Sequence, residues 1–327
     1  MAVGTAHAQA HPNIALIKYW GNRDERLRLP ANSSLSFNLS GLQTTTQVTW
    51  IEDKSGDSLI LNGREARTDE LSRVIRHLDM LRSHLGIRGY AHVESGNNFP
   101  TGTGIASSAS AFAALTAAAT SAAGLHLDER TLTTLARLGS GSAARSIPAG
   151  FVEWHASDAH EDSYAESIAP ADHWTLIDVI AIVSTSHKAV GSTAGHASAA
   201  TSDLQNARVA GAERRLTQCR SAVLTRDFAA LAEVVEEDSN LMHAVMMTSR
   251  PPLFYWLPAT LAIMAAVRRW RTEGLQVCYT LDAGPNIHCI CGPEAAAEVR
   301  NRLQSISGVV DIRSAPPGGG VTIERLA

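Results

Sequence analysis

The sequence of 327 residues has no long hydrophobic run and no excess of basic residues. No stretch approaches the roughly 18 consecutive apolar residues of a membrane-spanning helix, so we expect no membrane partner. The first ten residues lack a basic segment followed by an apolar core, so we expect no signal peptide. The 28 lysine and arginine residues are scattered and the formal net charge is −4, which argues against a nucleic-acid partner.

Cysteine is also scarce, with only Cys219, Cys278, Cys289 and Cys291. The last two alternate in a strand-like run, which is not the spacing of a metal site. None of the 13 histidines forms a pair with the spacing of a zinc protease, so we expect no zinc site and leave the metal ligands unknown. We interpret the cysteines as buried, reduced thiols of a cytoplasmic protein.

Length and composition are those of a globular protein with a well-buried core, with 45% apolar and 18% charged residues. The chain is long enough for two domains, and a hydrophobic strand beginning at Trp174 is the expected start of the second. We therefore place the boundary so that the domains are residues 1–173 and 174–327. No internal repeat or low-complexity tail is visible.

Hydrophobic periodicity predicts both strands and helices. Strands are expected at 44–51, 58–61, 90–94, 174–184, 276–281, 287–291, 309–312 and 321–324. Helical spacing is expected at 71–85, 111–123, 127–138, 196–223, 227–247 and 258–273. This mixture permits an α+β fold.

A glycine-rich loop that leads into an alanine-rich helix, residues 96–124, is the most informative stretch. It contains a proline, two glycines and two adjacent serines: Pro100, Gly102, Gly104, Ser107 and Ser108. The first N–H groups of a helix have no internal partner and the dipole there is positive, so this arrangement suits an anion such as phosphate. The loop is neither a Walker A loop nor a dinucleotide fingerprint. A flexible linker beside a core helix is the structural alternative.

A lysine ends an apolar run near the start of the chain. Residues 14–17 predict a buried strand that delivers Lys18 and Tyr19 to its end. Burying an unpaired ammonium group is costly. Lys18 therefore either extends to water or meets an anion, and both readings stay open.

Two further loops carry single charged residues. In the first, Ser140, Gly141 and Ser142 can donate hydrogen bonds to a phosphate, and the Arg145 guanidinium can bind a carboxylate with two hydrogen bonds. A turn with a solvated arginine is an equally good reading of that loop in isolation. In the second, Asp282 follows an expected strand and begins the sequence Asp-Ala-Gly-Pro-Asn. This is either a simple hairpin turn or the support for a fixed carboxylate.

Together these stretches resemble a known family. The loop Pro100-x-x-x-Gly104-Ile105-Ala106-Ser107-Ser108-Ala109 is similar to the phosphate loop of the GHMP kinase superfamily. Three blocks resemble one branch of it, the mevalonate diphosphate decarboxylases: Asn13-Ile14-Ala15-x-x-Lys18-Tyr19-Trp20-Gly21 with its continuation to Ser36, Gly139 to Trp154, and Asp282 to Asn286. The blocks span residues 11–286 in the family's order, so the resemblance covers most of the chain.

The resemblance implies a two-domain α+β fold of the GHMP kinase type, with ATP and substrate in the cleft between the domains. It also implies the cofactors ATP and Mg²⁺, a phosphorylated mevalonate as substrate, and a cytoplasmic homodimer. The implied catalytic residues are Asp282, Arg145 and Lys18. The implied substrate-binding residues are Tyr19, Trp20, Gly21, Asn22, Ser140, Gly141, Ser142, Ala143, Ala144, Ser192 and Thr193. The implied ATP-binding residues are Asn98, Pro100, Gly102, Thr103, Gly104, Ala106, Ser107 and Ser108.

The implied reaction belongs to isoprenoid biosynthesis by the mevalonate pathway. ATP phosphorylates the C3 hydroxyl of a 5-phosphorylated mevalonate, and the new phosphate then leaves as the carboxylate is lost as CO₂. Two alternatives stay open: a GHMP small-molecule kinase that releases no CO₂, and a binding protein without activity. Kinases of the superfamily generally lack the Arg145 block, which favours the decarboxylase.

Asn22 departs from the family pattern and bears on which mevalonate is used. The family usually has a lysine there, which helps to hold the substrate's diphosphate. A neutral amide removes attraction for the most charged end of the substrate. We therefore predict a preference for mevalonate 5-phosphate, giving isopentenyl phosphate, over mevalonate 5-diphosphate, giving isopentenyl diphosphate. Arg23, His187 or Lys188 could compensate for the missing charge.

Overall fold

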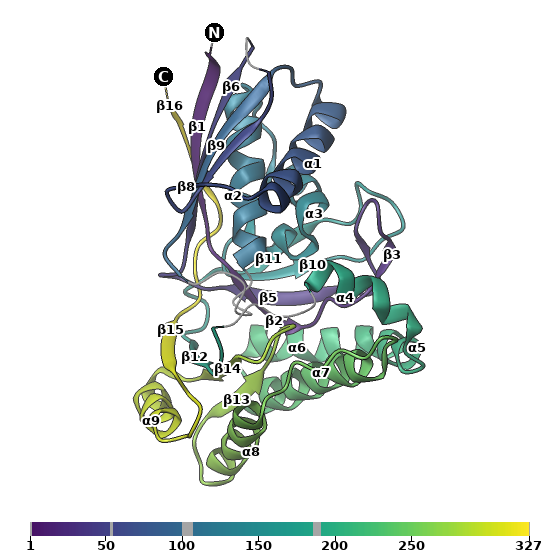
Figure 1. Ribbon diagram of the computed structural model, residues 1–327. Helices are drawn as coiled ribbons and strands as arrows, with labels where there is room; N and C mark the ends of the chain where they lie inside the picture. The colour runs from purple at the N-terminus through teal and green to yellow at the C-terminus, as the bar shows by residue number, and fades with distance from the viewer. Residues whose placement is uncertain (1, 53–54, 100–106, 186–190, 327) are drawn as a thin grey trace.

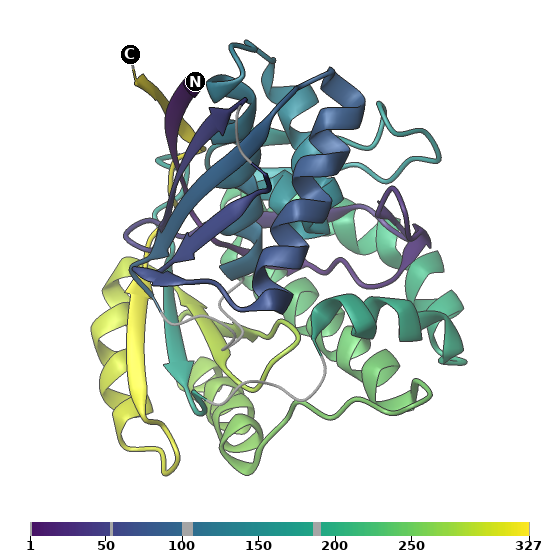
Figure 2. The same cartoon turned by 45° about the horizontal axis from the view of Figure 1, so that its top comes forward.

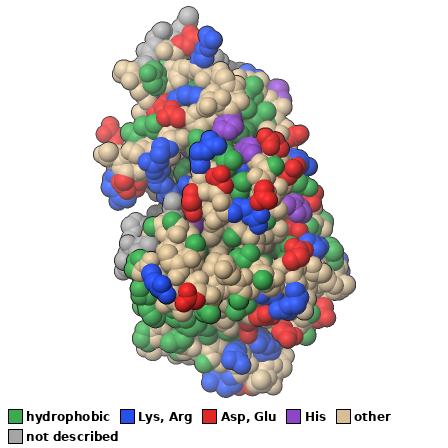
Figure 3. All heavy atoms as spheres, turned by 90° about the vertical axis from the view of Figure 1, so that its right-hand side faces the viewer, with side chains coloured by type: hydrophobic (Ala, Val, Ile, Leu, Met, Phe, Trp, Pro, Cys, Tyr) green, Lys and Arg blue, Asp and Glu red, His purple; other side chains and the backbone are tan. Residues whose placement is uncertain are grey.

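The structure, a computed structural model, describes residues 2–52, 55–99, 107–185 and 191–326. In these residues a large sheet backed by helices lies above a second group of sheets and helices (Figure 1). The expected two-domain α+β fold is confirmed. None of the described helices is both long and apolar enough to cross a membrane. On the face shown in Figure 3, basic and acidic side chains are interspersed.

The upper sheet has six strands in the order β16-β1-β6-β9-β7-β8. These are Thr322–Leu326, Ala2–Ala10, Thr44–Ile51, Tyr90–Asn97, Ser58–Leu61 and Arg64–Glu65. Side chains of β6 are alternately buried and half-buried, as expected for a sheet with one covered face. Helices α1 (Thr68–Leu85), α2 (Ser107–Ala122) and α3 (Glu129–Gly139) lie to one side of this sheet, and α2 packs on β1 and β6 (Figure 2).

Small side chains bring α2 close to β1. Ala6, Ala8 and Ala10 of β1 are fully buried in the same cluster as the alanines of α2. A Cβ atom on Gly4 would lie 2.3 Å from the carbonyl oxygen of Ala122. The sheet and helix backbones are therefore packed at a distance that only small residues permit.

The lower part contains two four-stranded sheets. The first has the order β11-β10-β5-β2, with bounds Ala165–Ala169, Phe151–Trp154, Ser34–Asn38 and Asn13–Ile17. The second has the order β13-β14-β12-β15, with bounds Val277–Thr280, Ile287–Cys291, Ile177–Ile182 and Asp311–Ala315. A short hairpin joins β3 (Asn22–Asp24) and β4 (Leu29–Pro30).

Helices cover these sheets. They are η1 (Gly141–Ser146), α4 (Ser192–Ser198), η2 (Ala199–Thr201), α5 (Gln205–Ala210), α6 (Ala212–Thr225), α7 (Phe228–Thr248), α8 (Pro258–Thr272) and α9 (Pro293–Gln304). One hydrophobic cluster joins Ile14 and Phe37 of the first lower sheet to Val234 of α7 and Ile290 of β14. The ends of β2 and β13 are thereby held close together.

Several predicted elements differ from those observed. The single helix expected at 196–223 is wrong, because the chain forms α4, η2, α5 and α6 there. Ser202 leaves the helical conformation with φ −83° and ψ 128°, and its hydroxyl lies 2.6 Å from that of Thr248. β1 and α9 were not predicted. The four cysteines are free and buried, as expected.

Candidate active site

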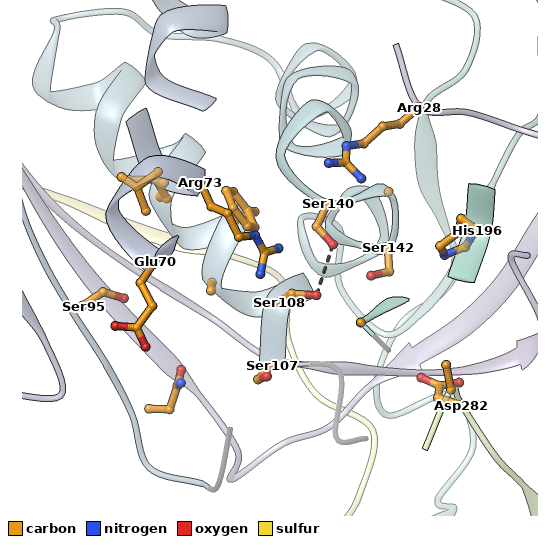
Figure 4. Close-up of a pocket in the computed structure, with 18 of the residues that line it drawn as sticks. Arg28, Glu70, Arg73, Ser95, Ser107, Ser108, Ser140, Ser142, His196 and Asp282 are labelled. Carbon is orange, nitrogen blue, oxygen red and sulfur yellow. Dashed lines mark hydrogen bonds between the residues drawn. The ribbon is translucent and has the colours of Figure 1, made fainter. Parts of the chain in front are cut away.

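A cavity of about 580 Å³ lies where the upper and lower parts meet. Its lining combines residues that are far apart in sequence and includes Lys18, Arg145, Asp282, Ser107, Ser108, Ser140, Gly141 and Ser142. Figure 4 shows several of these side chains directed into the same space. The structure therefore brings together the three predicted catalytic residues with residues of both phosphate-binding stretches.

Lys18 and Asp282 form a short ion pair at this cavity. Lys18 Nζ donates a hydrogen bond to Asp282 Oδ1 at 2.7 Å, and the Lys18 side chain is only 1% exposed. Burial lowers the pKa of Lys18, although Asp282 and Asp238 oppose that shift. For Asp282, burial opposes ionisation, but attraction to Lys18 and His288 lowers the pKa overall. The pair thus provides an ionised carboxylate at the wall of the cavity.

Buried polar contacts fix the backbone of Lys18. Its N–H donates to Asp238 Oδ2 at 2.6 Å, and its carbonyl oxygen accepts from Arg208 at 2.8 Å and Asn32 at 3.0 Å. Asp238 also pairs with Arg215 at 2.7 Å and is fully buried. Lys18 follows the end of β2, outside the regular sheet hydrogen bonds. These contacts fix its backbone and therefore the position of its ammonium group at the cavity.

Asp282 is held by the end of β13. The N–H of Leu281 donates to the Ser239 hydroxyl at 3.0 Å, and Thr280 reaches the Ala15 carbonyl of β2 at 3.3 Å. Nearby, a fully buried pair joins His288 Nδ1 to Asp178 Oδ2 at 2.6 Å. Burial opposes protonation of His288, but Asp178 raises its pKa overall, and His288 in turn contributes to lowering the pKa of Asp282.

Arg145 is a buried cation without a carboxylate partner among the described residues. Its Nη1 donates to Ser34 Oγ at 2.5 Å and its Nη2 to Asn13 Oδ1 at 3.3 Å, while its buried Nε has no partner there. Burial lowers the pKa of Arg145 to about 10, so it stays protonated at neutral pH. Asp282 attracts this buried charge without forming an ion pair with it, and an anion in the cavity would compensate it further.

The aromatic wall of the site comes from Tyr19 and Trp20. The Tyr19 ring stacks on His196 with centroids 4.1 Å apart, and Trp20 lies 4.5 Å from the same imidazole. The Tyr19 hydroxyl donates to Asn22 Oδ1. A Cβ atom on Gly141 would lie 2.5 Å from the Tyr19 ring, so only glycine allows this loop to approach the ring.

Only some of the other predicted binding residues line the cavity. Ser107 and Ser108 begin α2, and the hydroxyls of Ser108 and Ser140 lie 3.2 Å apart (Figure 4). Asn98 is not among the described residues that line the cavity, because its amide binds the backbone of Gln43 and Gly41. Gly21, Asn22, Ala143 and Ala144 adjoin the lining residues without lining the cavity themselves. Pro100, Gly102, Thr103, Gly104 and Ala106 lie outside the described residues, and Ser192 and Thr193 begin α4.

Sequence reasoning missed several residues at the site. Arg28, Arg73 and His196 line the cavity, and Asp238 and His288 support its charged groups. Nothing local marks these residues, because their partners are distant in sequence.

Comparison with known proteins gives one consistent family. The sequence model described as diphosphomevalonate decarboxylase-like N-terminal domain matches residues 10–165, and that described as mevalonate 5-diphosphate decarboxylase C-terminal domain matches residues 178–314. The diphosphomevalonate decarboxylase of Ganoderma lucidum is 40% identical over 311 residues, covering 88% of this chain and 78% of that protein.

Two solved structures are similar over nearly the full length. MDDEF in complex with MVAPP, AMPPCP and magnesium has a TM-score of 0.93 and 36% identity, with 99% of each chain covered. The second is a structure of the mevalonate diphosphate decarboxylase from Enterococcus faecalis, described for its mevalonate diphosphate mediated ATP binding mechanism. It has a TM-score of 0.91 and 36% identity, again with 99% of each chain covered.

These comparisons overturn the predicted preference for mevalonate 5-phosphate. The relatives are named for the diphosphate, and a similar structure contains MVAPP, so reading Asn22 as a change of substrate was wrong. In the structure, the amide of Asn22 binds Tyr19 and the Glu25 carboxylate and lies outside the cavity lining. The expected decarboxylase branch is confirmed: this chain belongs to the diphosphomevalonate decarboxylase family.

Proposed function

We propose that this protein is an ATP-dependent mevalonate 5-diphosphate decarboxylase. It would transfer a phosphate to the C3 hydroxyl and then release phosphate and CO₂, giving isopentenyl diphosphate and ADP. One observation carries the proposal. The Lys18–Asp282 ion pair lines the same cavity as Arg145, which is buried and forms no ion pair with a carboxylate among the described residues. A base for a hydroxyl and a cation for a carboxylate are what this reaction needs.

Asp282 acts as the base in this proposal. Its carboxylate accepts the proton of the C3 hydroxyl as that oxygen attacks the phosphate. Lys18 keeps Asp282 ionised and adds positive charge near the transferred group, because its ammonium lies 2.7 Å from the carboxylate. Phosphoryl transfer depends mainly on positioning and on neutralising charge, which a fixed ion pair supplies.

Arg145 binds the C1 carboxylate and aligns it for loss of CO₂. When the C3–O bond breaks, the electrons of the C1–C2 bond form the C2–C3 double bond. That requires the C1–C2 bond to be held in line with the departing phosphate. Arg145 is suited to this because Ser34 and Asn13 fix its guanidinium while Nε lacks a partner in the described part of the chain.

The remaining cavity fits ATP. An apolar region is lined by Leu59 and Leu61 of β7, Val74 of α1 and Val93 of β9, which suits a flat base. The serines at the start of α2 suit phosphate oxygens. On the other side, Ser140, Gly141 and Ser142 would bind the phosphates of the substrate.

The donors present also fit Mg²⁺, which shields phosphate charge when bound. No group of three or more histidine, cysteine or acidic side chains forms a metal cage in the described residues. Mg²⁺ commonly takes one or two protein oxygens and completes its shell with phosphates and water. Asp282, Ser107 and Ser108 are the oxygen donors at the cavity that would serve.

A matched assay tests the function. Purified protein is incubated with Mg-ATP and either mevalonate 5-diphosphate or mevalonate 5-phosphate, and ADP and CO₂ are both measured. We expect CO₂ to be released in step with ADP from the diphosphate. ADP without CO₂ would instead show a kinase, and CO₂ from the monophosphate alone would contradict the proposed substrate.

The resemblance also leads us to propose a cytoplasmic homodimer and a domain boundary between residues 173 and 174. The match to the N-terminal family model ends at residue 165 and the match to the C-terminal model begins at residue 178, which supports a boundary between them. Sedimentation equilibrium is expected to give twice the chain mass of 34.8 kDa. A mass of one chain at micromolar concentration would contradict the dimer.

A further inference from the structure

Arg28 is a cation at the cavity that no motif identified. It lies in the turn between β3 and β4, and it alone of the hairpin residues 22–30 lines the cavity. Its Nε donates to the Leu138 carbonyl at the end of α3 at 2.9 Å. In Figure 4 the guanidinium extends toward Ser140, with Ser142 and Arg73 nearby.

Arg28 forms no ion pair within the described part of the chain, although Asp69 and Glu70 line the same cavity. No carboxylate within ion-pair distance of Arg28 or Arg73 occurs among the described residues, although both line the cavity. Burial lowers the pKa of Arg73, the neighbouring Arg28 lowers it further, and attraction to Asp69 opposes both effects. Arg28 also has φ +50°, a conformation that non-glycine residues rarely adopt. Arg73 is exposed and attracted by Asp69, whereas Arg28 is half-buried and holds its guanidinium at the cavity without an ion-pair partner among the residues described, which favours an anion beside Arg28.

Asn22 and Arg23, at the start of the hairpin, already have partners. Asn22 is neutral, and its amide binds Tyr19 and Glu25. Arg23 pairs with Asp158 at 2.6 Å and donates to the carbonyls of Pro30 and Ala31. Arg23 is therefore a poor source of the charge that Asn22 does not supply, whereas Arg28 faces the cavity.

We propose that Arg28 binds the terminal phosphate of the substrate's 5-diphosphate and so determines specificity for the diphosphate over the monophosphate. This inference rests on the proposed function. Ser140 and Ser142, which line the same cavity, are the expected donors to the same group. The terminal nitrogens of an arginine suit two phosphate oxygens at once.

Steady-state kinetics of Arg28→Gln test the inference, with CO₂ release followed for both mevalonates and with ATP varied separately. A lost charged hydrogen bond predicts a rise of about tenfold or more in KM for mevalonate 5-diphosphate. KM for ATP should change less than about twofold, and the preference for diphosphate over monophosphate should fall. Arg26→Gln, in the same turn but outside the cavity lining, is the matched control and should behave as the wild type.

Two further variants separate charge from folding. Arg28→Lys should recover part of the affinity for the diphosphate. Asn22→Lys combined with Arg28→Gln should also recover part of it, because the new lysine supplies a positive charge from the first strand of the hairpin. An unchanged KM for the diphosphate in Arg28→Gln would overturn the inference. A rise confined to KM for ATP would also overturn it, because the bound phosphate would then be the nucleotide's. Absence of CO₂ release by the wild type would instead reject the proposed function.

Discussion

Asp282→Asn is expected to lower kcat for CO₂ release by about 10²–10⁴-fold, the usual contribution of a positioned base. The amide retains the shape of the side chain but cannot accept the proton of the C3 hydroxyl. It also removes the carboxylate 2.7 Å from Lys18 that opposes the lowering of the Lys18 pKa by burial, so the ammonium group loses its proton more easily and supplies less positive charge near the transferred phosphate. Stopped-time assays of ADP and CO₂ at saturating substrate measure the effect.

The double variant Lys18→Met with Asp282→Asn is the control for this first prediction. If the two residues act as one unit, removing both should cost little more than removing the more damaging one. Thermal unfolding of each variant distinguishes lost chemistry from lost folding. Retention of more than about a tenth of wild-type kcat by Asp282→Asn would show that another group takes the proton.

Asp238→Asn is expected to lower the free energy of unfolding by about 3–5 kcal/mol, the usual cost of breaking a buried ion pair. Asp238 is fully buried, and it binds both Arg215 Nε at 2.7 Å and the Lys18 N–H at 2.6 Å. A neutral amide leaves the Arg215 guanidinium buried without its counter-charge. Urea denaturation followed by circular dichroism measures the loss.

The neighbouring residue provides a matched control. Glu237 forms an ion pair of the same length, 2.7 Å, with Arg214, but both side chains are at least 36% exposed. Glu237→Gln should therefore change the free energy of unfolding by less than about 1 kcal/mol. Equal losses for the Glu237 and Asp238 variants would contradict the argument that burial of the Asp238 pair sets its importance.

Local sequence patterns predicted the helices and strands whose own residues show a regular hydrophobic periodicity. The strand at 44–51 was predicted with its observed bounds because its alternation of buried and half-buried residues is regular. Lys18 stood out because an ammonium in an apolar run requires a partner. β1 was missed because its buried side chains are alanines, which favour helices and give little hydrophobic contrast.

Pairings across the chain could not be predicted in this way. The contact of Lys18 with Asp238 joins residues far apart in sequence, and only the packing of α7 beside β2 brings them together. The error over Asn22 has the same origin. Arg23, His187 and Lys188 were considered as compensating charges, but Arg28, six residues after Asn22, was not, and it is the hairpin residue that lines the cavity.

The pairing of β16 with β1 has a consequence for synthesis of the protein. Of the strands in the upper sheet, β1 is translated before the others and β16 after them, yet the two are neighbours, and they lie side by side in Figure 1. Until residues 322–326 have left the ribosome, β1 is an unprotected edge that can pair with another strand. The upper sheet can therefore be completed only after residues 322–326 have been synthesised, and a nascent chain stalled before that point should be prone to aggregation.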